Sequence, residues 1–294
     1  MKIGIYGQFY HEDSEKFIQY ILDALQKRDV NIVVEEDFLK NIKKNEEISK
    51  RFVSLESFKS LDSSYDFLIG IGGDGTILKS VTFVGELGIP IIGINTGRLG
   101  FLATIQKEKI TECLNHILSG NYYLSERSLL TVSTDPEDAS MFPLNFALNE
   151  VAVNRKNTTS MIKVETKING EPLTSYWSDG LIVSTPTGST GYSLSCGGPI
   201  IDPKTQSLVI TPIAPHNLSV RPLIIPDNCT ISLTISGREK SYLVSLDSRI
   251  ATLKNQTTII IKKAPFRINL VQLKEDRFIK TLREKLLWGE DKRN

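Results

Sequence analysis

The chain has 294 residues, which is enough for two modest domains or one large one. Its 35 lysine and arginine residues are balanced by 34 aspartate and glutamate residues, so it has no broad cationic field to bind a nucleic acid or an anionic membrane. The three cysteines are widely separated, and no apolar run approaches the length of a membrane span. These features predict a cytoplasmic protein that has neither a nucleic-acid partner nor a membrane partner.

The first hundred residues alternate between strand patterns and helix patterns. Apolar runs of strand length occupy residues 2–6, 31–34, 67–71 and 90–94. Residues 14–28 and 76–86 each place apolar side chains on one helical face. The polar segment 37–51 is interpreted as a surface loop or an irregular helix with a solvated face. This order predicts an α/β domain with a mostly parallel sheet.

After a helix near residues 108–118, the pattern becomes a succession of strands. The candidates are residues 129–132, 146–153, 161–168, 181–184, 231–235, 242–246 and 259–262. Asn169-Gly170 predicts a hairpin turn, and strict alternation over residues 230–236 indicates one buried and one polar face. The segment is therefore expected to form a β-rich, β-sandwich-like domain.

The last residues predict a closing helix with Phe278, Leu282 and Leu286 on one side. We expect this helix to pack back on the first domain. The predicted division is an α/β domain of residues 1–103 plus 272–294, and a β-rich domain of residues 104–271.

A glycine turn, Gly72-Gly73-Asp74-Gly75-Thr76, lies between a predicted strand and a predicted helix. With the preceding residues it matches the dinucleotide-binding fingerprint, but an aspartate within the turn would meet a bare pyrophosphate with a like charge. The following strand also ends in an asparagine rather than in the acidic residue that binds a ribose. A simple dinucleotide-binding turn is therefore rejected.

The same turn suits phosphoryl chemistry. Its glycines let backbone amides approach phosphate oxygens, and we interpret Gly72, Gly73 and Thr76 as a phosphate cradle. Asp74 is expected either to accept the proton of an attacking hydroxyl or to help hold the divalent metal of a nucleoside triphosphate. Lys79 stands where its ammonium would touch phosphate. The alternative is a tight turn in which Asp74 only caps the helix.

Three other segments add to this picture. Asn95 to Phe101 is a second glycine turn after a strand, in which Phe101 either stacks on a base or packs in the core, with the core favoured. Asp179 to Pro199 is a segment dense in serine, threonine and glycine, whose hydroxyls and amides we expect to be exposed for ribose or phosphate. Asn149-Glu150 lies within an apolar strand and must find partners or face a cleft.

These segments together resemble the NAD kinase family, in the family's order and over most of the chain. The matching segments are Gly72 to Thr76, Asn95 to Phe101, Asn149-Glu150, Asp179 to Pro199, and Pro215 to Leu223. The glycine-aspartate turn alone is shared with lipid kinases and phosphofructokinases, so the later segments narrow the choice. The resemblance implies transfer of the γ-phosphoryl group of ATP to the 2′-hydroxyl of the adenosine ribose of NAD, which makes NADP.

The resemblance also implies the roles of individual residues. Asp74 is the expected proton acceptor, and Gly75 is expected to contact NAD. The residues expected to bind the nucleotide are Asp74, Gly75, Lys79, Phe101, Asn149, Glu150, Ser160, Trp177, Asp179, Thr187, Thr190, Gly191, Tyr192, Ser193, Leu194, Ser195 and Ala214. A divalent cation, Mg²⁺ or Mn²⁺, is expected to accompany ATP without a dedicated protein-only site. A homodimer or homotetramer is expected as well.

Two positions depart from the family pattern. Gly191 stands where alanine is common, and Arg249 stands where many relatives have glutamine, so the role of that glutamine is not transferred. Two alternative functions stay open from the residues: a lipid kinase of the diacylglycerol or sphingosine type, and a dinucleotide-binding regulator without catalysis.

Overall fold

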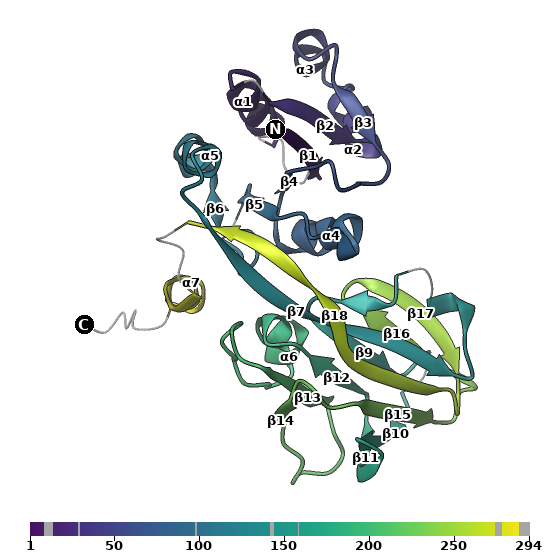
Figure 1. The fold of residues 1–294 in the computed structure, drawn as a ribbon. Helices are drawn as coiled ribbons and strands as arrows, with labels where there is room; N and C mark the ends of the chain where they lie inside the picture. The colour runs from purple at the N-terminus through teal and green to yellow at the C-terminus, as the bar shows by residue number, and fades with distance from the viewer. Residues whose placement is uncertain are drawn as a thin grey trace. The chain divides into compact units, whose positions relative to one another are not determined.

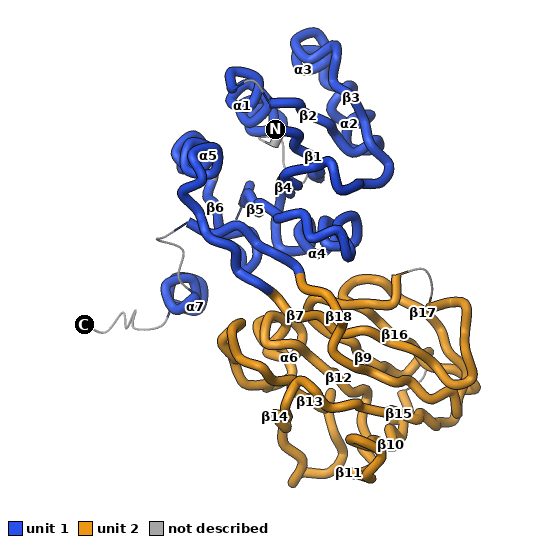
Figure 2. Tube along the Cα trace, in the orientation of Figure 1, with its two compact units in different colours: residues 1–126, 268–294 blue, residues 127–267 orange. Residues whose placement is uncertain are grey.

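The structure is a computed structural model, and it describes residues 1–8, 14–28, 30–97, 99–141, 144–157, 159–273 and 278–287. The chain forms two compact units (Figure 2). Unit 1 comprises Met1–Glu126 and Ile268–Asn294, and unit 2 comprises Arg127–Arg267. No described helix is both long enough and apolar enough to cross a membrane.

Unit 1 is an α/β domain (Figure 1). Its elements are β1 (Lys2–Gly7), α1 (Ser14–Gln26), β2 (Asn31–Glu35), α2 (Glu36–Ile42), α3 (Glu46–Arg51), β3 (Glu56–Phe58), β4 (Phe67–Ile71), α4 (Asp74–Val84), η1 (Gly85–Leu87), β5 (Ile91–Asn95), β6 (Ile105–Gln106), η2 (Lys107–Lys109), α5 (Ile110–Leu118) and α7 (Phe278–Leu286). The strand order is β3-β2-β1-β4-β5-β6, and all of these pairs are parallel. The predicted parallel sheet is confirmed.

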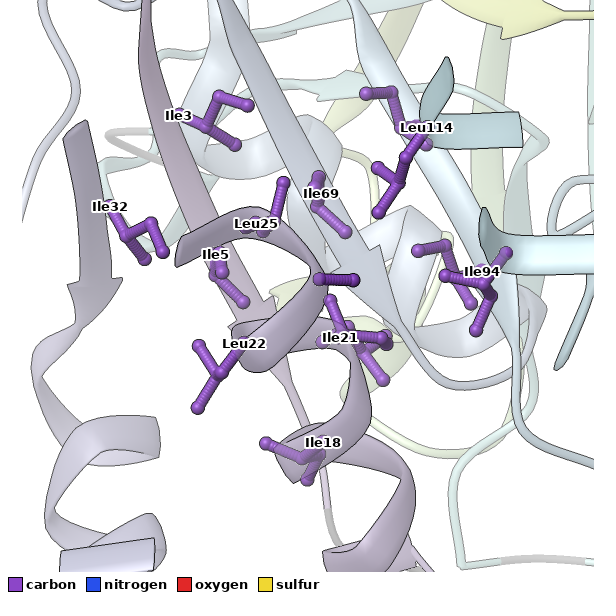
Figure 3. Close-up of a cluster of buried hydrophobic side chains, with 14 of the residues drawn as sticks. Ile3, Ile5, Ile18, Ile21, Leu22, Leu25, Ile32, Ile69, Ile94 and Leu114 are labelled. Atoms are coloured by element: carbon purple, nitrogen blue, oxygen red, sulfur yellow. The ribbon is translucent and has the colours of Figure 1, made fainter. Parts of the chain in front are cut away.

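One face of this sheet carries the larger apolar core. Side chains of α1 and α5 pack on alternate strand residues, because successive strand side chains point to opposite faces. In Figure 3, Ile21 and Leu25 of α1 lie against the strand that carries Ile69. On the other face, α4 approaches so closely that a Cβ on Gly70 would lie 2.7 Å from Ile77. The strand glycine therefore permits the packing of the helix that follows the glycine turn.

The segment 37–51 differs from its predicted structure as a solvated loop or irregular helix. It forms the regular helices α2 and α3, and Phe38, Leu39, Ile42 and Ile48 are buried in the core of unit 1. The side chain of Asn45 caps α3 by accepting a hydrogen bond from the amide of Ile48. A few apolar residues among many charges were enough to bury one face of each helix.

Two long strands, β7 (Tyr123–Asp135) and β18 (Thr258–Gln272), carry the chain between the units. The first change of unit falls at residue 126 rather than at the expected 103. Helix α5 belongs to unit 1 because Ile110, Cys113, Leu114 and Ile117 join the same buried cluster as α1. The return to unit 1 at Ile268 is four residues before the expected position.

Unit 2 is built almost entirely of antiparallel strands. Its remaining elements are η3 (Ala139–Met141), β8 (Phe146–Ala147), β9 (Glu150–Asn154), β10 (Ile162–Ile168), β11 (Glu171–Ser178), β12 (Gly180–Ser184), η4 (Thr187–Thr190), α6 (Tyr192–Ser195), β13 (Ser207–Ile213), β14 (Leu223–Pro226), β15 (Ile231–Ser236), β16 (Ser241–Leu246) and β17 (Arg249–Lys254). One sheet has the order β14-β13-β12-β9-β16-β17, and the strands β11-β10-β15-β18 are the unit 2 part of the other sheet. A single buried cluster takes side chains from both sheets, which confirms the sandwich-like domain.

Candidate active site

The glycine turn joins β4 to α4, and its backbone requires glycine at one position. Gly72 has a φ of +153°, and a Cβ there would lie 2.2 Å from the hydroxyl oxygen of Thr76. Its amide donates to the carbonyl of Ile94 on β5 at 2.9 Å, which ties the turn to the neighbouring strand. A Cβ on Gly73 or on Gly75 would meet no atom within 4 Å, so the start of α4 presents open backbone. Such a helix start suits an anion.

The carboxylate of Asp74 is held by the loop that follows β5. Its Oδ1 accepts hydrogen bonds from the amides of Leu102 and Ala103 at 2.9 and 3.1 Å. Its Oδ2 accepts one from the amide of Phe101 at 2.9 Å. A Cβ on Gly100 would lie 1.9 Å from Oδ1, so the close approach of this loop depends on glycine. Asp74 is therefore oriented by a long-range contact and is more than a cap on its own helix.

The C-terminal helix α7 also reaches this carboxylate. The Nζ atom of Lys285 lies 3.7 Å from Oδ2 of Asp74 and 4.8 Å from the centre of the Phe101 ring. The rings of Phe101 and Phe278 lie 6.3 Å apart, so α7 contacts the loop near both of its ends. The predicted packing of the last helix on the first domain is confirmed by these contacts.

The other predicted residues of this unit are placed less uniformly. Thr76 is fully buried, and its hydroxyl, which has no hydrogen-bond partner among the described residues, faces Gly72. A phosphate would reach that hydroxyl only if the turn moved. Lys79 is exposed on α4, with its ammonium 5.9 Å from the centre of the Phe83 ring. Arg98, within the second glycine turn, lies outside the described residues.

In unit 2, the Asn149-Glu150 pair stands at the start of β9 and is organised by a buried aspartate. The carboxylate of Asp247 accepts hydrogen bonds from three successive amides, those of Leu148, Asn149 and Glu150, at 3.0, 2.8 and 3.2 Å. The amide of Asp247 in turn donates to the carbonyl of Glu150 at 3.0 Å. These contacts fix the backbone from which both predicted site residues project.

Glu150 is a buried carboxyl group with few hydrogen bonds to offset the loss of hydration. Its side chain is 7% exposed, and its Oε2 has no hydrogen-bond partner among the described residues. Burial, and then the nearby charge of Asp247, raises the pKa of Glu150 to about 8, and only the amide of Tyr192 opposes this shift. Asp247 has three amide donors and a neighbouring arginine, so we assign the negative charge of the pair to Asp247. At neutral pH the Glu150 carboxyl group is therefore mostly protonated.

The oxygen Oδ1 of Asn149 is likewise buried without a hydrogen-bond partner among the described residues. Two neighbouring buried side-chain oxygens without partners are uncommon inside a domain, because each costs free energy of desolvation. The arrangement fits a polar ligand that would complete their hydrogen bonds.

The serine- and threonine-rich loop packs against this pair, and one expectation about it was wrong. Its hydroxyls are mostly used inside the protein rather than exposed. The Thr185 hydroxyl donates to the carbonyl of Leu148 at 2.6 Å, the Ser189 hydroxyl donates to the carbonyl of Pro186 at 2.7 Å, and Ser193 hydrogen-bonds Thr211 at 2.8 Å. These hydroxyls supply hydrogen bonds to groups in and around a tightly folded loop, which contains η4 and α6 and has no strand pairing of its own.

Two glycines of this loop touch the Asn149-Glu150 pair. A Cβ on Gly188 would lie 2.1 Å from the carbonyl oxygen of Asn149, so that contact excludes every other residue. A Cβ on Gly191 would lie 3.1 Å from Oε2 of Glu150 and 3.4 Å from Nδ2 of Asn149. The position that departs from the family's alanine thus leaves extra room beside both polar groups.

The remaining predicted loop residues differ in their exposure. Thr187 is buried, and its carbonyl accepts a hydrogen bond from the hydroxyl of Thr190 at 3.2 Å. Leu194 is half-buried, whereas Ser195 and Tyr192 are exposed at the surface of α6. Partial burial of the Tyr192 side chain, followed by the charges of Cys196, Asp179 and Glu150, raises the pKa of Tyr192.

Asp179 and three further predicted residues lie around the start of β12. Asp179 forms an ion pair with Arg155, whose Nε lies 3.1 Å from Oδ1, and its amide donates to the carbonyl of Ile213 at 3.0 Å. Trp177 is 54% exposed, and Ala214, at the end of β13, has a φ of +44°. Ser160 is half-buried just before β10, whose Ile162 pairs with Ser178.

Arg249 is engaged within unit 2. Its guanidinium donates to the carbonyl oxygens of Leu144, at 2.7 Å, and of Phe146, and it lies 3.9 Å from the carboxylate of Asp247. Its carbon Cζ lies 5.2 Å from the centre of the Phe146 ring. In this position the arginine braces the segment that leads into Asn149-Glu150.

The predicted residues are therefore divided between the units: the glycine turn, Lys79 and Phe101 belong to unit 1, and the rest belong to unit 2. Sequence reasoning missed the contacts of Lys285, Arg155 and Asp247. An aspartate in a short link between strands was the signal for Asp247, and a lysine seven residues after Phe278, on the same helix face, was the signal for Lys285. Neither signal is specific without the fold.

Comparisons with known proteins show which family the chain is similar to. The family model of the ATP-NAD kinase N-terminal domain matches residues 3–122, and that of the ATP-NAD kinase C-terminal domain matches residues 148–273. The NAD kinase of Christiangramia forsetii is 60% identical over 294 residues, which is 100% of both chains. The NAD kinase of Flavobacterium psychrophilum is 54% identical over the same extent.

Two solved structures are similar as well. Yeast NADH kinase complexed with NADH has a TM-score of 0.86 and 26% identity, with coverage of 99% of this chain and 88% of that chain. An NAD kinase from Archaeoglobus fulgidus in complex with ATP has a TM-score of 0.73 and 25% identity, with coverage of 98% and 99%.

Proposed function

The chain belongs to the NAD kinase family, and from that premise we propose how its own residues carry out phosphoryl transfer from ATP to NAD. The family reaction phosphorylates NAD and makes NADP. We assign the acceptor hydroxyl to carbon 2′ of the adenosine ribose. Asp74 is the residue that receives its proton.

The observation that carries this proposal is the unequal use of the two oxygens of Asp74. A carboxylate has about four lone-pair positions, two on each oxygen. Oδ1 accepts two amide hydrogen bonds, whereas Oδ2 accepts one. Oδ2 therefore retains capacity for a hydroxyl proton, while the three amides hold the carboxylate in one orientation. A base that is fixed before the substrate arrives loses little entropy in the transition state.

Binding of the nucleotide is assigned to the other residues. The open amides at the start of α4 would face phosphate oxygens, with Gly72, Gly73 and Gly75 allowing the approach. The unpartnered polar atoms of Asn149 and Glu150 support a role in hydrogen bonding to the adenosine portion of NAD. Asp179 and the segment from Thr187 to Ser195 complete the proposed nucleotide site, largely through backbone groups.

The proposal includes a divalent cation, Mg²⁺ or Mn²⁺, brought by the triphosphate. Among the described residues, no three His, Cys, Asp or Glu side chains cluster as a metal site. Mg²⁺ usually keeps several waters and is bound largely through substrate phosphates, so a cation held by the phosphates of ATP needs no dedicated protein site, and the remaining lone pair of Asp74 Oδ2 is left to the substrate hydroxyl. Such a cation would neutralise charge on the transferring group.

Two further parts of the proposal concern the protein as a whole. We propose a cytoplasmic location, which is supported by the free state of Cys113, Cys196 and Cys229. We also propose a homodimer or homotetramer, as the family resemblance implies. Size-exclusion chromatography with light scattering measures that state directly.

The primary test is to incubate the purified protein with NAD, ATP and magnesium and to detect NADP. Product formation is expected, with NADH, other triphosphates and polyphosphate as comparison substrates. If no NADP forms with any donor or metal while NAD still binds, the chain is a dinucleotide-binding regulator instead.

The test of the base is Asp74→Asn. Turnover should fall by about 10² or more, the usual size of a general-base effect, while NAD still binds. The amide group would oppose the N–H of Phe101, so a melting curve is needed to show that the loop and unit 1 remain folded. A folded Asp74→Asn variant with near-normal turnover would refute the base assignment.

A further inference from the structure

We propose that Lys285, on the C-terminal helix α7, is a positioning residue of the phosphoryl-transfer site. Its ammonium stands beside Oδ2 of Asp74, holds that oxygen in its reactive orientation, and supplies positive charge where the phosphoryl group is transferred. The inference rests on the proposed role of Asp74. It goes beyond that role, because neither the glycine turn nor the nucleotide-binding segments contain Lys285.

Lys285 approaches one particular oxygen of the Asp74 carboxylate. Lys285 Nζ lies 3.7 Å from Oδ2, the oxygen that accepts one amide hydrogen bond, and that is beyond a direct hydrogen bond. The pair is therefore electrostatic, and it leaves the remaining lone pair of Oδ2 open to a substrate hydroxyl. Oδ1, which already has two amide donors, is not the oxygen with which Lys285 pairs.

Lys285 also contacts the aromatic ring of Phe101. Its ammonium lies 4.8 Å from the centre of the Phe101 ring, within the range of a cation–π interaction. Phe101 also donates its amide to Oδ2 of Asp74, and its ring contacts Phe278 on the same helix. One residue of the loop thus connects the base to both ends of α7.

Lys285 lies on the same face of α7 as the buried residues of that helix. Phe278 and Lys285 are seven residues apart and so lie on one face, with buried Thr281 and Leu282 between them. On this face a lysine would ordinarily weaken the packing of an amphipathic helix. Here it is matched by the carboxylate of Asp74, which is 30% exposed, whereas Lys280 lies on another face of the helix.

Both partners are partly open to solvent, so the ion pair itself contributes little to folding. Its effect is expected in catalysis, because charge builds up near Oδ2 only during transfer and fixed charges act strongly at that stage. Lys285→Met should therefore lower kcat about 10-fold and change the KM for NAD less than about 3-fold. The expected loss in kcat is larger than that from removing a surface ion pair and smaller than that from removing a fixed donor to the transition state.

The test compares Lys285→Met, Lys285→Gln and Lys285→Arg with the control Lys280→Met, which removes the same charge from another face of α7. Both neutral variants should lose about 10-fold in kcat, Lys285→Arg should stay within about 3-fold of wild type, and the control should be unchanged. Melting temperatures should agree within a few degrees. A merely structural role of α7 would instead lower the melting temperature and would leave kcat of the folded protein unchanged.

A double-mutant cycle with Asp74→Asn decides whether Lys285 works through Asp74. In that background Lys285→Met should have almost no further effect, since residues that act as a unit are not additive. Additive losses in kcat in the double-mutant cycle would overturn the inference. A kcat of Lys285→Met within twofold of wild type would overturn it as well. A Lys285→Met variant that is faster than wild type would also overturn it and would identify an inhibitory contact. Failure of the proposed function is separate: it would appear as absent NADP in wild type or an active Asp74→Asn variant.

Discussion

Replacing Glu150 by glutamine tests whether this buried carboxyl group is neutral in the folded protein. Burial and the charge of Asp247 raise the pKa of Glu150 from 4.5 to about 8. Between these values the folded state binds more protons than the unfolded state, so this group contributes stability that is lost as the pH rises through the window. Glutamine is neutral at every pH and removes that dependence.

The expected size follows from the width of the window. Each pH unit between the two pKa values corresponds to about 1.4 kcal/mol, so the full effect is roughly 3–5 kcal/mol. Relative to wild type, Glu150→Gln should gain less than about 1 kcal/mol at pH 5 and roughly 3–5 kcal/mol at pH 9. A constant cost of fitting the amide would shift both values equally, so the decisive quantity is the difference between the values at pH 9 and pH 5.

Urea denaturation at pH 5, 7 and 9, followed by tryptophan fluorescence, measures these differences. Glu171→Gln is the matched control, because Glu171 is an exposed carboxylate in the same unit. It should follow wild type within about 0.5 kcal/mol at every pH. A difference between Glu150→Gln and wild type that is the same at pH 5 and pH 9 would refute the assignment of the proton to Glu150.

Two further predictions use glycines that make close contacts. Gly100→Ala would place a Cβ 1.9 Å from the carboxylate of Asp74, so turnover in the NADP assay should fall at least 10-fold, whereas Gly97→Ala, with open space around it, should keep wild-type turnover. Gly188→Ala would place a Cβ 2.1 Å from a backbone carbonyl and should destabilise unit 2 by about 3 kcal/mol or more. For Gly191→Ala the nearest contact is a side-chain oxygen at 3.1 Å, so the loss of stability should be less than about 1.5 kcal/mol. A melting experiment measures both losses. Equal turnover of the first pair, or equal stability of the second, would contradict the contacts described.

The order of the predicted elements was readable from local patterns. The apolar run 67–71 followed by glycines and a helix is a short-range signal, and so is the alternation in residues 230–236, because each depends on the period of a strand or a helix. The segment 37–51 shows the limit of this reasoning. Its composition is that of a solvated surface, and only the packing of Phe38 and Ile42 on the sheet shows that it forms helices with a buried face.

The chemical character of the candidate site was readable in the same way. A glycine turn with an aspartate, and a polar pair inside an apolar strand, are unusual enough in sequence to make Asp74, Asn149 and Glu150 candidate site residues, and their roles stay predictions. The hydroxyls of the serine- and threonine-rich loop were misjudged, since composition does not tell whether a hydroxyl such as that of Ser189 bonds to its own loop or to a ligand.

What the sequence by itself determined is which groups are available: a carboxylate in a glycine turn between a strand and a helix, and polar groups in a core strand. Only the tertiary structure decided their state. Oδ1 of Asp74 accepts two amides of a later loop and Oδ2 accepts one beside Lys285, and Asp247 fixes the strand that carries Glu150 while raising its pKa. The physical reason is that hydrogen-bond saturation and local charge depend on contacts between residues far apart in the chain, and local sequence periodicity contains no information about those contacts.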